Sequence, residues 1–142
     1  MLDFYDNQTN HEVNLGLLRE HSSSALPAII ARDTGPGSAV LKNLAEVEVS
    51  LVSNQEIARI HADFLDDPTE TDVITFQHGE LVISVDTAAR EVENRAWPLE
   101  RELLLYVIHG LLHLHGYLDA QPDEREEMHE VQNAIIDVVW PV

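Results

Sequence analysis

The sequence predicts an α+β fold: one mixed domain with a small, mainly four-stranded sheet flanked by helices. Short segments with the apolar–polar alternation of strands occur between residues 2 and 85. Longer segments with apolar residues at helical spacing lie between them and fill the C-terminal part. Strands and helices do not alternate strictly, and no repeat or linker divides the 142 residues. We therefore expect a single domain over residues 1–142.

The N-terminal part begins with a strand and a helix. Residues 2–6 alternate apolar and polar side chains, which predicts a strand. Apolar residues at helical spacing predict a helix over 15–31, interrupted near Ser22–Ser24, with Pro27 in a first helical turn. Residues 33–38 are rich in Gly and Pro and are predicted as a loop.

A strand and a helix follow in the centre of the chain. Residues 45–52 show the clearest strand pattern, with three apolar side chains on one face: Val47, Val49 and Leu51. A helix over 54–65 is expected next, because Ser53 or Asn54 can cap it. Its buried face is predicted to hold Ile57, Ile60 and Phe64.

The remaining elements are two strands and three helices. Strands are predicted over 72–76 and 80–85, and a helix over 86–96 that starts at an Asp86 cap. Trp97-Pro98 ends this helix. A long apolar helix then runs from Leu99 to His115 and stops at Gly116. The last helix begins near Asp123, with one buried face: Met128, Val131, Ile135 and Val138.

The chain is strongly acidic, with 26 Asp and Glu residues, eight Lys and Arg residues and a net charge of −18. This charge excludes a broad basic footprint on nucleic acid, so any contact with RNA has to be local. The absence of cysteine excludes disulfides and thiolate metal sites. Neither a signal peptide nor an apolar run of membrane-spanning length is present, so we expect a cytoplasmic protein without membrane association.

Two histidines on the long helix have the spacing of metal ligands. His109 and His113 are four residues apart, so both imidazoles lie on one helix face and can hold one ion. Gly116 can adopt a positive φ and turn the chain back, which brings Asp119 within reach as a third ligand. Three protein ligands and one open position are typical of catalytic zinc. The sequence therefore predicts one Zn²⁺ per chain, with a water at the open position.

The other histidines lack this spacing. His115 lies two residues after His113 and points to another face, so it is predicted as a surface or packing residue. The rest are expected to have no part in the site: His11, His21, His61, His78 and His129.

Several segments resemble the YbeY family of bacterial endoribonucleases and rRNA maturation factors. HGLLHLHGY at 109–117, followed by Asp119, is similar to the family pattern H-G-x-L-H-L-x-G-Y-D-H. TDVITF at 71–76 and GELVIS at 79–84 resemble two strands of the family, T-D-V-L-S-F and G-D-I-x-I-x. Further matches follow in order: Glu102-Leu103 and Met128. The resemblance extends over about residues 44–136.

The resemblance implies a zinc-dependent, single-strand-specific endoribonuclease that acts in maturation of the 16S rRNA 3′ end and in ribosome quality control. Its partners would be rRNA and ribosomal small-subunit proteins. The three zinc-binding histidines of the family fall on His109, His113 and Asp119, so the third is replaced by a carboxylate that can still bind zinc. The preceding family aspartate is Leu118. An arginine that the family often carries falls near Leu65.

Two other functions are open at this point. A non-catalytic ribosome-biogenesis factor with a structural zinc fits the missing arginine and the acidic charge. A zinc peptidase is disfavoured, because its H-E-x-x-H motif supplies a glutamate as general base and Gly110 stands there. Glu102 lies about two helical turns before His109. It is a candidate catalytic residue that would either support the metal ligands from outside the coordination sphere or act on the substrate. The alternative for Glu102 is an exposed helix residue.

Overall fold

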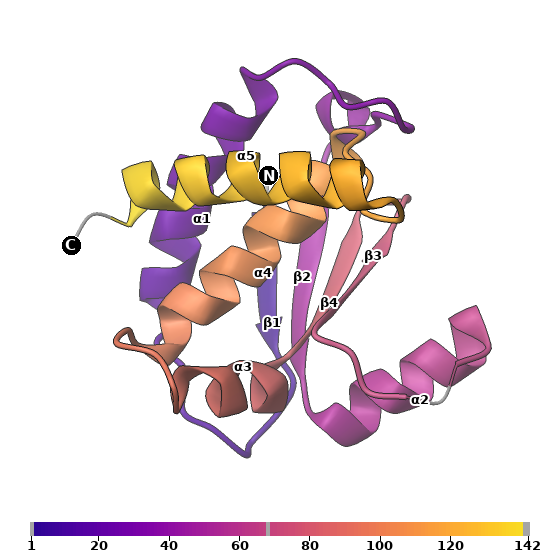
Figure 1. Cartoon of the computed structure of the whole chain (residues 1–142). Coiled ribbons are helices and arrows are strands. Elements are labelled where there is room, and N and C mark those ends of the chain that lie inside the picture. The colour runs from indigo at the N-terminus through magenta and orange to yellow at the C-terminus, as the bar shows by residue number, and fades with distance from the viewer. Residues whose placement is uncertain (1, 68, 141–142) are drawn as a thin grey trace.

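The computed structural model describes residues 2–67 and 69–140. Its four-stranded sheet has the order β1-β2-β4-β3 (Figure 1). The strands are β1 (Leu2–Asp6), β2 (Val47–Val52), β3 (Val73–Phe76) and β4 (Glu80–Ser84). β1, β2 and β4 are parallel, and β3 pairs antiparallel with β4. The predicted α+β fold with a small four-stranded sheet is confirmed.

Most of the helices pack together around one long apolar helix, and another helix packs elsewhere on the sheet. The helices are α1 (Leu15–Ile30), the 3-10 turn η1 (Leu41–Asn43), α2 (Asn54–Leu65), α3 (Val85–Val92), α4 (Leu99–Leu114) and α5 (Pro122–Val139). α4 packs on β3 and β4 and is contacted by α1, α3 and α5 (Figure 1). α2 packs against β4 near the lower right of the view, away from α4. Within residues 2–67 and 69–140, every helix is too short or too polar to span a lipid bilayer.

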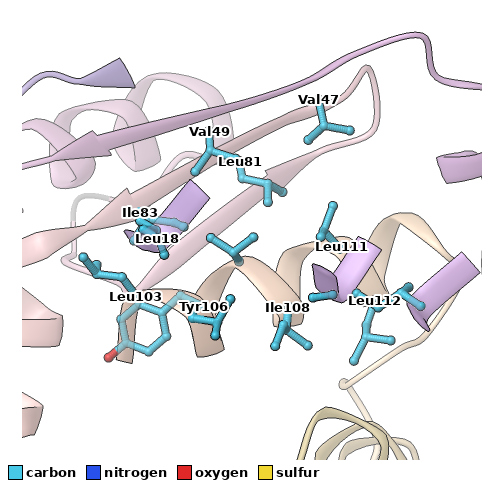
Figure 2. Packing of buried hydrophobic residues seen from close by; sticks show 14 of the residues in the cluster. Leu18, Val47, Val49, Leu81, Ile83, Leu103, Tyr106, Ile108, Leu111 and Leu112 are labelled. Atoms are coloured by element: carbon cyan, nitrogen blue, oxygen red, sulfur yellow. The ribbon is translucent and has the colours of Figure 1, made fainter. Parts of the chain in front are cut away.

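The main core lies between the sheet and α4. Alternate residues of β2 and β4 face it, including Val47, Val49, Leu81 and Ile83 (Figure 2). They meet apolar residues of α4 such as Leu103, Ile108, Leu111 and Leu112. A smaller cluster on the opposite face holds Val52, Ile57, Ile74 and Val82. The long apolar helix that the sequence predicted is therefore the central helix of the fold, α4.

α1 is continuous, which corrects the predicted interruption near Ser22–Ser24. Its buried positions follow helical spacing: Leu18, Ser22, Ala25 and Ile29. Small side chains at two of these positions let the helix pack closely on its neighbours. Pro27 lies inside the helix instead of in a first turn, so one backbone hydrogen bond is lost, and the buried face offsets that cost.

Two side chains predicted to be buried are exposed. Phe64 is 68% exposed near the end of α2, where its ring makes a T-shaped contact with Phe76. Val138 is 74% exposed, and Val139 is buried in its place. Eleven residues make about three helical turns, so Val139 aligns with Met128 and Val138 does not.

The start of α3 also differs from the prediction. Ser84, one residue before the helix, accepts a hydrogen bond from the Thr87 amide and is the N-cap. Asp86 instead accepts the Asn54 amide proton at the start of α2, over 2.7 Å. The carboxylate therefore serves a neighbouring helix. α3 ends at Val92, earlier than predicted.

Candidate metal centre

The three predicted ligands meet at one point. The Nε2 atoms of His109 and His113 lie 3.2 Å apart. Asp119 Oδ2 lies 3.5 Å from the first and 3.2 Å from the second. One ligand atom from each residue falls within 4.8 Å of the other two, so the group could hold a metal ion.

Both imidazoles are oriented by hydrogen bonds on their outer nitrogens. His109 Nδ1 donates to the Gln132 side-chain oxygen over 2.9 Å, and His113 Nδ1 donates to the Tyr117 carbonyl over 3.0 Å. The proton of each neutral ring is therefore on Nδ1, and both Nε2 lone pairs face Asp119. Two lone pairs and a carboxylate oxygen at this spacing repel one another unless a cation lies between them. The donor set fits a metal ion bound by imidazole and carboxylate.

A turn after α4 positions Asp119. Gly116 has a φ of +97°, which glycine adopts without strain. Its carbonyl accepts the Gly37 amide over 2.7 Å, and the Gly35 amide donates to the His115 carbonyl over 3.1 Å. A side chain at Gly35 would overlap the Gly116 carbonyl. The Gly- and Pro-rich loop predicted at 33–38 thus holds the turn that carries the third ligand.

His115 has a packing role in this turn and none at the metal centre. It is fully buried, and its Nε2 donates to the Arg32 carbonyl over 2.8 Å. The Tyr117 hydroxyl donates to the Asp33 carbonyl over 3.1 Å. Both side chains therefore anchor the end of α4 to the segment that follows α1.

Two contacts that support the ligands have no signal in the sequence. Gln132 lies on α5, and its partner His109 lies on α4. Arg125, also on α5, donates to the backbone carbonyl of Asp119 over 3.3 Å. Their roles depend on how α5 packs across α4, which periodicity alone does not reveal.

Burial and charge favour the neutral form of His109. Burial lowers the pKa of His109, and the neighbouring His113 lowers it further. The hydrogen bond to Gln132 and the carboxylates of Asp72 and Asp119 act in the opposite direction but are weaker. A neutral imidazole is the form that binds a metal ion.

The ligands form part of the wall of a cavity of about 340 Å³. Other parts of the wall come from α2, from the segment that leads into β3 and from the residue that follows β3: His61, Leu65, Thr71, Asp72 and Gln77. No Lys or Arg of the described residues lines it. Leu65, where the family resemblance would put an arginine, is at the wall. His61, which was expected to have no part in the site, is there too, with Nδ1 on the Thr69 carbonyl at 3.0 Å.

Glu102 lies outside this cavity. It is 4% exposed and accepts the Trp97 indole N–H over 3.0 Å, so the exposed alternative is wrong. It lines a second cavity of about 350 Å³, whose wall also includes Asp72 and His109. Glu102 is therefore a buried neighbour of the site, and a catalytic role for it stays a prediction.

Gly110 packs against the sheet. A Cβ at this position would lie 2.6 Å from Leu81 Cδ2. A side chain at the position of the general base in H-E-x-x-H peptidases would therefore point into the packed core here. This geometry adds to the case against a peptidase.

Comparison with known proteins adds independent information. The family described as Endoribonuclease YbeY matches residues 4–139. A protein named Endoribonuclease YbeY from Thermobifida fusca is 34% identical, in an alignment that covers 66% of this chain and 71% of the relative. One of the same name from Rhodococcus opacus is 30% identical, in an alignment that covers 92% of this chain and 79% of the relative. The fold is similar to the solution structure of TM1509 from Thermotoga maritima, with a TM-score of 0.65, 26% identity, and coverage of 99% of this chain and 89% of that one.

Proposed function

The chain belongs to the Endoribonuclease YbeY family, and from this premise we propose that it is a zinc-dependent endoribonuclease that cleaves single-stranded rRNA. Maturation of the 16S rRNA 3′ end and ribosome quality control, with ribosomal small-subunit proteins as partners and a cytoplasmic location, belong to the same proposal. The observation that carries it is the meeting of two imidazole lone pairs and the Asp119 carboxylate at one point in the wall of a cavity.

The donor chemistry supports zinc. Two neutral imidazoles and one carboxylate are a ligand set of catalytic zinc sites. A bound zinc ion would supply a Lewis acid and a water activated for attack on a phosphodiester. In this chain Gln132 and the Tyr117 carbonyl hold the two imidazoles, and the turn at Gly116 brings in Asp119.

Asp119 in place of a third histidine changes the charge of the site by one negative unit. A metal ion held by this set is a weaker Lewis acid than one held by three neutral histidines. Since no Lys or Arg of the described residues lines the cavity either, we expect slow cleavage.

The test is cleavage of single-stranded RNA from the 3′ region of small-subunit rRNA by protein purified without a histidine tag. We expect fragments with zinc present, and none after chelation or in His113→Ala. His78→Ala is the matched control, because His78 is an exposed histidine that is outside the ligand set and does not line the metal cavity. Cleavage that persists in His113→Ala at the wild-type rate would contradict the proposal.

A non-catalytic ribosome-biogenesis factor with a structural zinc is the second candidate. The cavity without a described cation and the carboxylate third ligand favour it. It predicts bound zinc and association with small ribosomal subunits, together with intact RNA in the assay above. Zinc-dependent cleavage would exclude it.

A further inference from the structure

After its first two residues, α4 reaches the protein surface along a single line of side chains. From Arg101 to Leu114, four residues are not buried: Arg101, Leu105, His109 and His113. They are spaced four apart and so lie on one helix face. Two of them are the candidate metal ligands. At 1.5 Å per residue, Arg101 lies about 12 Å from His109 along the helix axis.

Three cavities follow this exposed line. The metal cavity and the second cavity share Asp72 and His109 in their walls. The second cavity and a third, of about 320 Å³, share Glu102 and Leu105. The hollows therefore adjoin one another from the metal centre to the N-terminal end of α4.

Two guanidinium groups meet one indole at the far end of this line. Arg101 Cζ lies 4.0 Å from the centre of the Trp97 ring, and Arg95 Cζ lies 5.4 Å from it. The indole N–H is bonded to buried Glu102, which fixes the ring. A guanidinium stacked on an aromatic ring keeps its N–H edge available for a phosphate oxygen.

Of the two arginines, Arg101 is the one whose guanidinium is not paired with a carboxylate among the described residues. Arg95 pairs with Glu91 at 3.6 Å, whereas Arg101 has no ion pair within the described part of the chain. Glu102 and Asp137 also line the third cavity. The Glu102 carboxylate is already engaged by Trp97, and Asp137 is exposed to solvent, which screens its charge.

We propose that Arg95, Trp97 and Arg101 form a subsite that binds a backbone phosphate of single-stranded RNA, away from the bond that is cleaved. The inference rests on the proposed nuclease function and deepens it. A chain of net charge −18 repels RNA at long range, so binding requires local cations. The metal cavity offers no described Lys or Arg, and this cluster holds two of the eight in the chain.

The experiment measures the binding of a labelled single-stranded RNA to the zinc-loaded protein by fluorescence anisotropy over a range of salt concentrations, read before cleavage is detectable. We expect Arg101→Ala to weaken binding about tenfold. It should also reduce the slope of log affinity against log salt by about 0.7, the value for one phosphate of a single strand. Trp97→Leu should act in the same direction. Arg19→Ala, at an exposed arginine of α1, should change neither quantity.

Arg101→Lys separates charge from general disruption. It keeps the cation, so the salt slope should stay as in the wild type while affinity falls moderately, because the planar stack is lost. In the cleavage assay, Arg101→Ala should raise KM and leave kcat unchanged, since the subsite is remote from the metal centre.

Two results separate this subsite from the nuclease function. If Arg101→Ala binds RNA with the affinity and salt slope of Arg19→Ala, the subsite is wrong, even where zinc-dependent cleavage is found. If the wild type cleaves nothing but binds RNA with an Arg101-dependent slope, the subsite stands and the nuclease function fails.

Discussion

Gln132 on α5 accepts the Nδ1 proton of His109 on α4 over 2.9 Å. The orientation of a candidate metal ligand thus depends on a helix that begins after the metal-binding motif has ended. Gln132 is 8% exposed, so water does not readily replace its oxygen. Hydrogen bonds of this kind fix the ring and raise the basicity of the ligand nitrogen.

Replacing Gln132 with leucine should therefore lower zinc affinity by about 10- to 100-fold, the usual effect of losing such a partner. Gln132→Glu keeps an acceptor for the His109 proton and should retain most of the affinity. Competition with a chromophoric chelator measures both variants. Equal affinity in Gln132→Leu and the wild type would show that the hydrogen bond does not support the metal site.

Removal of the third ligand tests the assignment of the site itself. Asp119→Ala leaves two imidazoles and an open turn, so most of the zinc found in the wild type by elemental analysis should be lost. His78→Ala should retain it.

His115→Ala is the comparison variant for the ligand assignment, because His115 is a histidine close to the site that is not expected to bind the metal. His115→Ala removes a buried side chain and its bond to Arg32, so we expect lower thermal stability with zinc still bound in the folded protein. Full zinc in Asp119→Ala combined with its loss in folded His115→Ala would show that the ligand set is wrong.

The ligands could be predicted because their geometry is local. His109 and His113 share a helix face through their spacing alone, and Gly116 limits where Asp119 can go. The strands could also be predicted from the sequence, because the alternation in residues 45–52 determines which side chains face the core.

The contacts that depend on packing between helices could not be predicted. Gln132, Arg125 and His61 reach the site only because α5 and α2 take particular positions. The error at the end of α5 has a different cause: Val139 lies eleven residues after Met128, so helical spacing in the sequence already favours it over Val138 as the buried residue.

Gly110 allows α4 to approach the sheet. A Cβ there would lie 2.6 Å from Leu81 Cδ2 and 2.9 Å from its Cδ1, and Leu81 is fully buried. Gly110→Ala should therefore lower the free energy of unfolding by about 1–3 kcal/mol through overpacking, as measured by urea denaturation.

A second substitution checks this cause. Leu81→Ala alone should cost about 2–5 kcal/mol by leaving a cavity. In the Gly110→Ala background it should cost less, because the new methyl group occupies part of that space. Strictly additive effects would mean that Gly110→Ala acts by some other route.

The last prediction concerns Asp86 and pH. Its carboxylate accepts hydrogen bonds from the Asn54 amide at 2.7 Å, from His11 Nε2 at 2.8 Å and from the Asn10 amide group at 3.3 Å. Burial acts to raise the pKa of Asp86, but the bonds from Asn54, Asn10 and His11 outweigh it, and the pKa falls below 3.8. Folding therefore favours the charged form.

A carboxyl group whose pKa is lower in the folded state than in the unfolded state stabilises the protein at pH values above its unfolded-state pKa. This stabilisation is lost as the pH falls through the folded-state pKa. Near neutral pH, Asp86→Asn should reduce the free energy of unfolding by about 2 kcal/mol, since a charged acceptor is lost. The difference between wild type and variant should shrink as the pH falls below 3.8.

Urea denaturation at several pH values measures this difference, with Asp137→Asn on the exposed face of α5 as the control. The control should differ little from the wild type at any pH, because exposed charges contribute little. A gap between wild type and Asp86→Asn that stays constant into the acid range would mean that the stabilisation does not come from the ionised carboxylate. The stabilising contact between the starts of α2 and α3 would then depend on the shape of the Asp86 side chain and not on its charge.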